Sequence, residues 1–308
     1  RRNSRSRYSR YGRDNHLVRN IIIISASAVI ALAVAGVLIW YFVFYQPTQT
    51  SQNDVSSTAP SVIESTQSTE STVSQQTAAN SYETLYPDMY VPQVEKIGAA
   101  EGEKSVYLTF NNAPSAQTDK LLDVLEQQGV KATFFIYCNE NTDAYLKESI
   151  KKIHDKGHTV GVLTNTYDYQ TIYASVENYL ADFAKVFDLI TEATGEKPTV
   201  FRFAGGSVNG YNQATIKDIV KEMERRGFTY HDWSLDSGDS NQWATGQQIY
   251  DTTVNGILNS GKSVVLMDNN SSATLEQLPA IIQKAKENGY EFKAMDATTK
   301  PFTMTLPE

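Results

Sequence analysis

The sequence predicts an α/β barrel of seven strand–helix units on the outer side of a single N-terminal transmembrane helix. Three observations lead to this prediction. An uncharged apolar run follows a basic N-terminal tail, a Ser/Thr/Gln-rich stretch comes next, and short apolar runs then alternate with amphipathic segments up to the C-terminus. The chain of 308 residues has room for such a barrel, because one α/β barrel routinely takes up more than about 200 residues.

Residues 1–19 form a basic tail with seven arginines and one acidic residue. From Ile21 to Phe44 the chain carries no charge, and a helix of these 24 residues is long enough to cross a hydrocarbon core of roughly 30 Å. A cleaved signal peptide is the alternative, but its apolar region typically spans only about 7–15 residues. Trp40 and Tyr41 are typical interfacial anchors. We therefore predict an uncleaved transmembrane helix over residues 20–45.

The charge distribution indicates the orientation and excludes one class of partner. No lysine or arginine lies between Arg19 and Lys96, so the positive-inside rule places the N-terminus in the cytoplasm and the C-terminal domain outside the cell membrane. The whole chain carries −8, of which the tail contributes +6, so residues 20–308 carry −14. This acidic remainder excludes nucleic acid as a partner, and membrane topology with contact to anionic lipid explains the arginine cluster.

Residues 46–83 form the predicted stalk. This stretch is mostly Ser, Thr, Gln, Asn and Ala, a composition that offers too little apolar surface to offset the entropy lost on ordering the chain. We expect a flexible tether that holds the next domain off the membrane, through or into a cell-wall layer.

Residues 84–308 form the predicted globular domain, in which apolar runs alternate with amphipathic helices. Regular alternation favours a parallel sheet covered by helices, and seven units favour closure into a barrel. The expected strands are Ser105–Phe110, Ala132–Tyr137, His158–Leu163, Thr199–Phe203, Phe228–Trp233, Ser263–Met267 and Tyr290–Met295. The expected helices are Thr118–Gln128, Ala144–Lys156, Val176–Thr194, Ala214–Arg226, Gln247–Asn259 and Leu275–Asn288, with C-terminal caps suited to Gly129, Gly157, Gly195, Gly227, Gly261 and Gly289.

The carboxyl ends of the strands carry five segments of interest, since chemistry sits at this end of such barrels. In chain order they are LTFNNAP (108–114), GHTVGVLTNTY (157–167), FRFAGGS (201–207), DWSLDSGD (232–239) and VVLMDN (264–269). Together, in this order, they resemble the five motifs of the polysaccharide deacetylases, the carbohydrate esterase family with the nodulation-type deacetylase domain. The resemblance covers roughly residues 95–300.

This resemblance implies a distorted barrel of seven strand–helix units. It also implies removal of acetyl groups from sugars of peptidoglycan, chitin or xylan, with one divalent metal such as Zn²⁺. The family's first motif supplies a base and a metal ligand from an Asp-Asp pair, which here is Asn111 and Asn112. Its two histidine ligands correspond to Leu163 and Tyr167, and its histidine acid corresponds to Asp268. By this resemblance the base, the acid and all three ligands are replaced.

The replacements remove the chemistry that the family needs. Asn112 is a neutral amide, Leu163 has no donor atom, and Tyr167 would have to lose a proton with an ordinary pKa of about 10. None of the three suits a Zn²⁺ ion that must activate water. Asn111 cannot accept a proton as a carboxylate does. We therefore expect no cofactor and no intact catalytic residue.

Other family positions are kept and predict a surviving groove. They are Arg202, which positions the base in the family, Trp233, an aromatic wall, Leu266, which lines the acetyl pocket, and the fourth-motif residues Asp236 and Asp239. A purely structural role is equally open. On that interpretation Asp239 or Asp268 neutralises Arg202, and Trp233 fills core volume.

The histidines of this domain do not restore catalysis. His158 opens a strand at the opposite end of the barrel, where packing is the expected role, and His231 should point to the other face of its strand from Asp232. A triad of Ser207, His231 and Asp236 lacks the sequence context of a nucleophile elbow.

Three functions stay open at this point. The first is an inactive, membrane-anchored member of the deacetylase family that binds peptidoglycan, another N-acetylated glycan or a partner at the cell wall. The second is an active deacetylase with an altered site, using Asp268 as base and a metal recruited by neighbouring carboxylates. The third is a regulatory protein that positions a cell-wall enzyme. The first is favoured, because the loss of every ligand together with base and acid is difficult to explain as tuning.

Overall fold

The computed structural model describes residues 82–98, 100 and 102–307. The predicted basic tail and transmembrane helix lie outside the described residues, as does the predicted stalk up to residue 81. Within the described ranges, no helix combines the length and the apolar character needed to cross a membrane.

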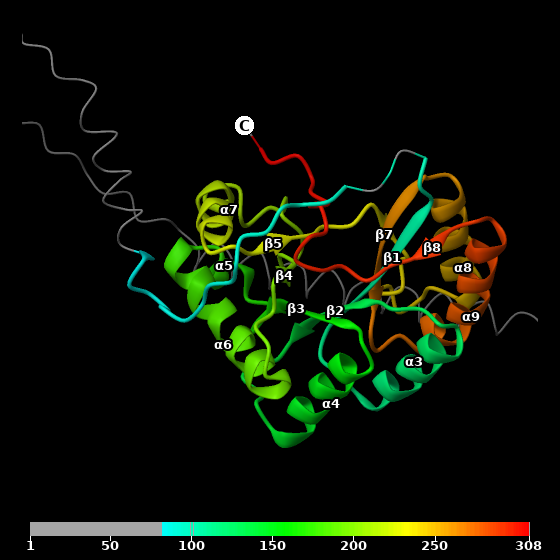
Figure 1. Cartoon of the computed structure of the whole chain (residues 1–308), viewed down its shortest axis with the longest axis horizontal. Helices are drawn as coiled ribbons and strands as arrows, with labels where there is room; N and C mark the ends of the chain where they lie inside the picture. The colour runs from blue at the N-terminus through cyan, green and yellow to red at the C-terminus, as the bar shows by residue number, and fades with distance from the viewer. Residues whose placement is uncertain (1–81, 99, 101, 308) are drawn as a thin grey trace, which may run out of the picture. The chain divides into compact units, whose positions relative to one another are not determined.

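A curved parallel sheet forms the centre of the domain, and helices cover its outer side (Figure 1). Neighbouring strands follow the order β5-β4-β3-β2-β1-β7-β6, and β8 pairs with β1 off this path. In the described part of the chain, β5 and β6 each pair with one strand and not with each other, so the sheet is barrel-like without closing there. The strands are β1 (Ser105–Asn111), β2 (Thr133–Tyr137), β3 (Thr159–Thr164), β4 (Val200–Phe201), β5 (Thr229–Tyr230), β6 (Leu235–Asp236), β7 (Lys262–Asp268) and β8 (Glu291–Phe292).

The alternation of strands and helices is confirmed, with differences in detail. The sequence interpretation missed two short elements, β6 and helix α5 (Tyr169–Ile172), which are too short to show a periodic pattern. Gly261 has no positive φ, so its predicted role as a helix cap is wrong, whereas the other five glycines predicted as caps have one.

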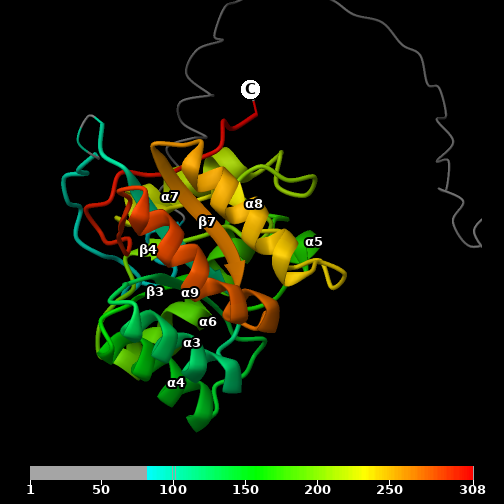
Figure 2. The same ribbon diagram turned by 90° about the vertical axis from the view of Figure 1, so that its right-hand side faces the viewer.

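Helices α8 and α9 lie side by side over β7 (Figure 2). The longer helices are α3 (Ala116–Gln127), α4 (Ala144–Asp155), α6 (Val176–Thr194), α7 (Ile216–Arg225), α8 (Gly246–Leu258) and α9 (Ser272–Glu287).

Both faces of the sheet are buried, which explains why its strands are apolar along most of their length. One face packs against the helices in a large cluster that includes Phe110, Phe134 and Val162. The alternate positions of the same strands form a smaller cluster inside the barrel, made of Tyr107, Phe135, Leu163, Val200, Val264 and Met295. Residues that follow these strands are therefore placed at the rim of a packed interior.

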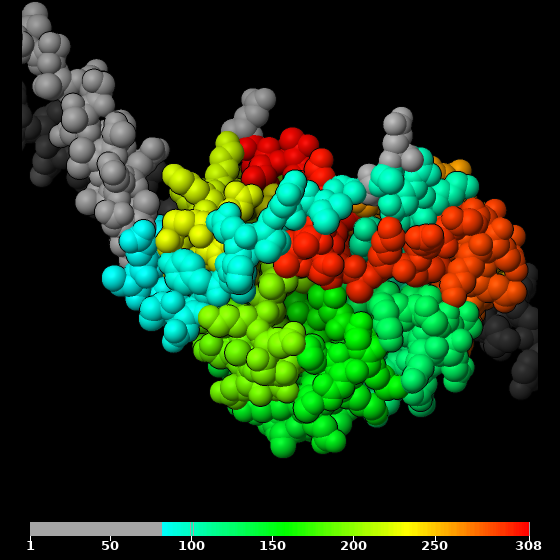
Figure 3. Space-filling model, viewed as in Figure 1, coloured from blue at the N-terminus to red at the C-terminus, as the bar shows by residue number. Residues whose placement is uncertain are grey.

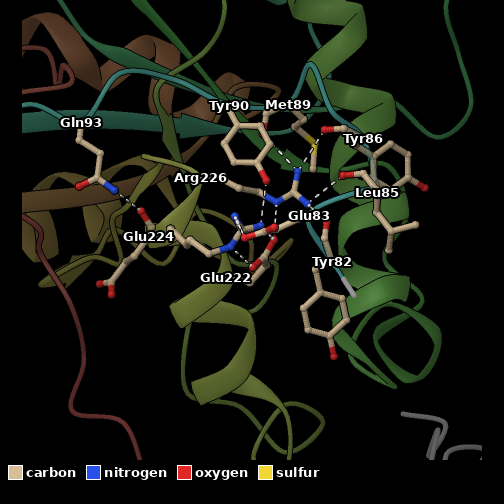
Figure 4. A network of polar contacts seen from close by, with 11 residues as sticks. Tyr82, Glu83, Leu85, Tyr86, Met89, Tyr90, Gln93, Glu222, Glu224 and Arg226 are labelled. Carbon is tan, nitrogen blue, oxygen red and sulfur yellow. Dashed lines mark hydrogen bonds and ion pairs between the residues drawn. The ribbon is translucent and has the colours of Figure 1, made fainter. Parts of the chain in front are cut away.

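The lead-in segment, residues 82–97, packs against helix α7 and is held by one buried arginine (Figure 4). The Arg226 guanidinium donates to backbone carbonyls of this segment at Tyr82, Leu85, Tyr86 and Met89. Its Nε donates to the carboxylate of Glu222, which is itself buried and supplies the compensating charge.

The lead-in segment then runs beside the C-terminal residues, where the Ile97 amide donates to the Thr298 carbonyl (Figure 3).

Candidate functional site

A cavity of about 190 Å³ lies at the carboxyl ends of β1, β6 and β7. Eight of the ten predicted site positions line it, and Arg202 and Leu163 do not. The sheet register explains the grouping, since Asn111 pairs with Asp268 across β1 and β7, and Asp236 pairs with Leu266 across β6 and β7. The lining residues are Asn111, Asn112, Tyr167, Tyr169, Gly205, Trp233, Asp236, Asp239, Ser240, Leu266, Met267 and Asp268.

The three positions that the sequence resemblance assigns to metal ligands do not fit a metal ion. The Tyr167 hydroxyl donates a hydrogen bond to Oδ1 of Asn112, so these two groups satisfy each other. Burial raises the pKa of Tyr167 well above its ordinary value, which keeps the phenol neutral and a weak ligand. Leu163 is buried inside the barrel. Across residues 82–307, apart from 99 and 101, no group of three or more His, Cys, Asp or Glu side chains is placed to hold a metal.

Arg202 lies fully buried beneath the cavity and bonds to neutral oxygens. Its guanidinium donates to the carbonyls of His231 and Asp232 and to the side chains of Thr109 and Asn111. The expectation that Asp239 or Asp268 neutralises it is wrong, because none of the ion pairs among the described residues includes Arg202.

Burial without a paired carboxylate lowers the pKa of the Arg202 guanidinium to about 9. The group nevertheless stays charged at neutral pH. The rings of Phe135 and Trp233 lie 4.4 and 5.6 Å from its central carbon and supply cation–π contacts in place of a counter-ion. The cavity therefore rests on an arginine whose charge is stabilised by carbonyl dipoles, by aromatic rings and, without a direct ion pair, by the nearby Asp232 carboxylate.

Three carboxylates line the cavity, and each accepts hydrogen bonds from neighbouring protein groups. Asp239 accepts hydrogen bonds from the Asp268 amide and the Thr274 hydroxyl, and burial raises its pKa. Asp268 accepts from the Asn270 amide through Oδ1, and Asp236 accepts from the Gly238 amide through Oδ1. In the described ranges, Oδ2 of Asp236 and of Asp268 has no hydrogen-bond partner. These two oxygens can accept from a ligand.

Three aromatic side chains line the cavity, and the sequence interpretation missed one of them, Tyr169. Tyr169 lies 6.2 Å from the Tyr167 ring and 5.5 Å from the Tyr211 ring. Tyr211 is 54% exposed, and Trp243, three residues beyond the lining residue Ser240, is 80% exposed. The only signal in the sequence was the cluster of tyrosines after β3, which sits in an irregular segment and the short helix α5.

The histidines play no part in this cavity. Neither ring nitrogen of His231 has a hydrogen-bond partner in the described part of the chain, and the Ser207 hydroxyl donates to Asp232 instead. This arrangement excludes a Ser207–His231–Asp236 triad. His158 lies at the amino-terminal end of β3, where its Nδ1 accepts from the Ala132 amide, as expected for a structural role.

Replacing Asn111 with aspartate is expected to stabilise the domain. Oδ1 of Asn111 already accepts from Arg202 at 3.0 Å, so a carboxylate would give this buried cation the counter-ion that it lacks. Repulsion from Asp268 on the neighbouring strand limits the gain to about 1 kcal/mol, or a rise in Tm of roughly 2–4 °C in a thermal scan. Asn112→Asp is the matched control, because Asn112 bonds to Tyr167 and not to Arg202. An equal rise in both variants would contradict this account of Arg202.

Comparison with known proteins identifies relatives of the chain. Residues 98–231 match the polysaccharide deacetylase family. The chain is 32% identical over 206 residues to the putative polysaccharide deacetylase YheN of Bacillus subtilis, covering 65% of this chain and 70% of that protein. It is 31% identical over 198 residues to a peptidoglycan-N-acetylglucosamine deacetylase of Bacillus cereus, covering 62% and 69%. The catalytic domain of peptidoglycan N-acetylglucosamine deacetylase from Eubacterium rectale superposes with a TM-score of 0.64 at 28% identity, covering 70% of this chain and 98% of that domain.

Proposed function

Because the chain belongs to the polysaccharide deacetylase family, we propose that it is a membrane-anchored member that binds cell-wall glycan outside the membrane without deacetylating it. One observation carries the proposal. The cavity at the family's site keeps its aromatic and acidic lining, while Tyr167 and Asn112 bond to each other where two metal ligands are expected. Two of these relatives are named peptidoglycan N-acetylglucosamine deacetylases, which supports a glycan of this kind as ligand.

The lining supports binding better than hydrolysis. Trp233, Tyr167 and Tyr169 present ring surfaces of the kind that sugar faces stack on, and the carboxylates accept hydrogen bonds from sugar hydroxyls. Asn111 has no proton-accepting carboxylate, and its amide oxygen is already bonded to Arg202. A water molecule in this cavity would therefore meet neither a metal nor the family's base.

A deacetylase working through an altered site is the second candidate, and Asp268 is the observation in its favour. Its carboxylate lies opposite Asn111 and keeps Oδ2 free of hydrogen bonds within the described ranges. A carboxylate so placed could act as a general base. The same experiment tests both candidates.

The purified full chain in detergent is expected to release no acetate above background. The substrates are N-acetylated peptidoglycan and chitooligosaccharide, each assayed with and without added Zn²⁺ or Co²⁺, and an intact family member is the control. The reason is that the base and the metal, which together supply the nucleophile, are both missing. Metal-dependent release that a chelator abolishes would overturn the proposal, and its loss in Asp268→Asn would assign the base of the second candidate.

Binding is tested separately by titration calorimetry of the full chain with peptidoglycan fragments. We expect saturable binding that weakens when Trp233 is replaced by alanine, because the indole forms a wall of the cavity. If no glycan binds to the folded protein, the proposal fails, and co-purification from solubilised membranes would then search for a protein partner.

A further inference from the structure

The cavity lining is acidic, and its negative charge favours a cationic ligand. Its lining contains three aspartates, Asp236, Asp239 and Asp268, and no lysine, arginine or histidine. The nearest cation, Arg202, is fully buried beneath it and directs its hydrogen bonds to protein oxygens. Burial raises the pKa of Asp239, but at least Asp236 and Asp268 keep acceptor oxygens for a ligand.

The arrangement of these carboxylates suits an ammonium group better than a metal ion. A divalent metal needs several ligands converging on one point, and in the described part of the chain no group of acidic, histidine or cysteine side chains converges in that way. An ammonium group is a point charge with a few hydrogen-bond donors, so one or two carboxylates and a ring face are sufficient to bind it. Asp268 at the end of β7 and, from one neighbouring segment, Asp236 and the Trp233 indole supply these partners.

The same lining matches an N-acetyl group less well than an ammonium group. The acetamide carbonyl is a hydrogen-bond acceptor, and the family would place it against a metal ion. Here it would meet carboxylate oxygens and the Tyr167–Asn112 pair, whose phenol proton and amide oxygen are already engaged with each other. The neutral amide groups of Asn111 and Asn112 can donate to this carbonyl, but the carboxylates attract only a donor, and most strongly one with positive charge.

We propose that the cavity selects de-N-acetylated, cationic amino sugars over their N-acetylated counterparts, an inference that rests on the proposed function. The protein then recognises glycan from which a hydrolysis of the amide has already removed the acetyl group. Tyr169 in the cavity lining, with the exposed Tyr211 ring packed against it, provides the ring faces that distinguish a sugar chain from other polycations.

The test compares two tetrasaccharides that differ only in acetylation, glucosamine tetramer and N-acetylglucosamine tetramer. They are titrated into the full chain in detergent, at an acidic pH where the free amines are charged. We expect the glucosamine tetramer to bind roughly tenfold more tightly, the effect of a charge-assisted hydrogen bond. Asp268→Asn and Asp236→Asn should each remove most of this preference, because they weaken binding of the glucosamine tetramer far more than binding of the N-acetylated tetramer. Asp251→Asn, an exposed aspartate on α8 outside the cavity lining, is the matched control and should change neither affinity.

Each contrary result has a distinct meaning. Equal or tighter binding of the N-acetylated tetramer overturns the inference but leaves glycan binding intact. If neither tetramer nor any peptidoglycan fragment binds, the proposed function itself fails. Tetralysine binding as tightly as the glucosamine tetramer would reject a sugar-specific site in favour of a basic peptide. An Asp251→Asn variant that weakens binding as much as Asp268→Asn would assign the attraction to the acidity of the whole domain.

Discussion

Replacing Gly227 with alanine is expected to destabilise the domain by about 3–5 kcal/mol, or a fall in Tm of roughly 10 °C in a thermal scan of the full chain. Gly227 follows helix α7 with φ of +91°, a conformation that costs an alanine roughly 1–2 kcal/mol. Its added Cβ would also lie 2.1 Å from the carbonyl oxygen of Val91. That carbonyl belongs to the lead-in segment, which the Val91 amide and the Arg226 side chain hold against the helix. The backbone at Val91 and the backbone at Gly227 must therefore move apart to admit the alanine.

Gly289→Ala separates the cost of backbone strain from the cost of the clash with the Val91 carbonyl. Gly289 also follows a helix, α9, with φ of +80°, but nothing lies within 4 Å of the position that its Cβ would take. This variant should lose only the roughly 1–2 kcal/mol of backbone strain. Equal losses in the two variants would show that the lead-in segment does not lie against the end of α7 as closely as described.

The long elements of the fold could be predicted because their burial leaves a periodic pattern. Helix α6 was expected and found over Val176–Thr194, since its apolar positions repeat at helical spacing and Gly195 ends it in the left-handed conformation. Strand β6 has two residues, one half-buried and one exposed, and shows no period. The predicted closure into a barrel is not found between β5 and β6 in the described part of the chain, because pairing of the end strands depends on curvature that no local pattern encodes.

The grouping of the site residues could be predicted from strand ends, but their partners could not. Asn111 and Asp268 end neighbouring strands, so parallel pairing brings them together. The bonds of Arg202 were predicted wrongly, because charge alone suggested a carboxylate partner, whereas carbonyls exposed at the ends of short strands supply its acceptors. Tyr169 was missed because its place depends on a tight turn and on Gly205, where any Cβ would lie 3.3 Å from the tyrosine ring.

The domain is expected to lose stability as the pH falls from 6.5 to 5, and two buried histidines are the cause. Burial lowers the pKa of His158 to about 4 and that of His231 to about 3, against about 6.5 in an unfolded chain. Below pH 6.5 these two histidines become protonated in the unfolded chain but stay neutral in the folded domain. The free energy of unfolding therefore falls by up to about 1.4 kcal/mol per pH unit for each histidine. At pH 5 the two together reach up to about 4 kcal/mol.

Two buried carboxylates act in the opposite direction. Burial raises the pKa of Asp182 and of Asp239, so their folded forms bind protons before the unfolded chain does, and this contribution stabilises the domain as the pH falls through their folded pKa values. Their effect begins at the raised folded pKa and is complete near the unfolded pKa of about 3.9. Variants that remove only the imidazoles are therefore needed to isolate the histidine effect.

The double variant His158→Asn, His231→Phe is expected to lose most of the pH dependence between 6.5 and 5. Asn can accept the Ala132 amide proton as Nδ1 of His158 does, and Phe fills the volume of an imidazole whose nitrogens have no partner in the described part of the chain. Urea unfolding at pH 7 and pH 5, followed by tryptophan fluorescence, gives the free energy of unfolding at each pH. The variant should be at least as stable as the parent at pH 5. A slope with pH equal to that of the parent would show that the destabilisation arises from groups other than these two imidazoles.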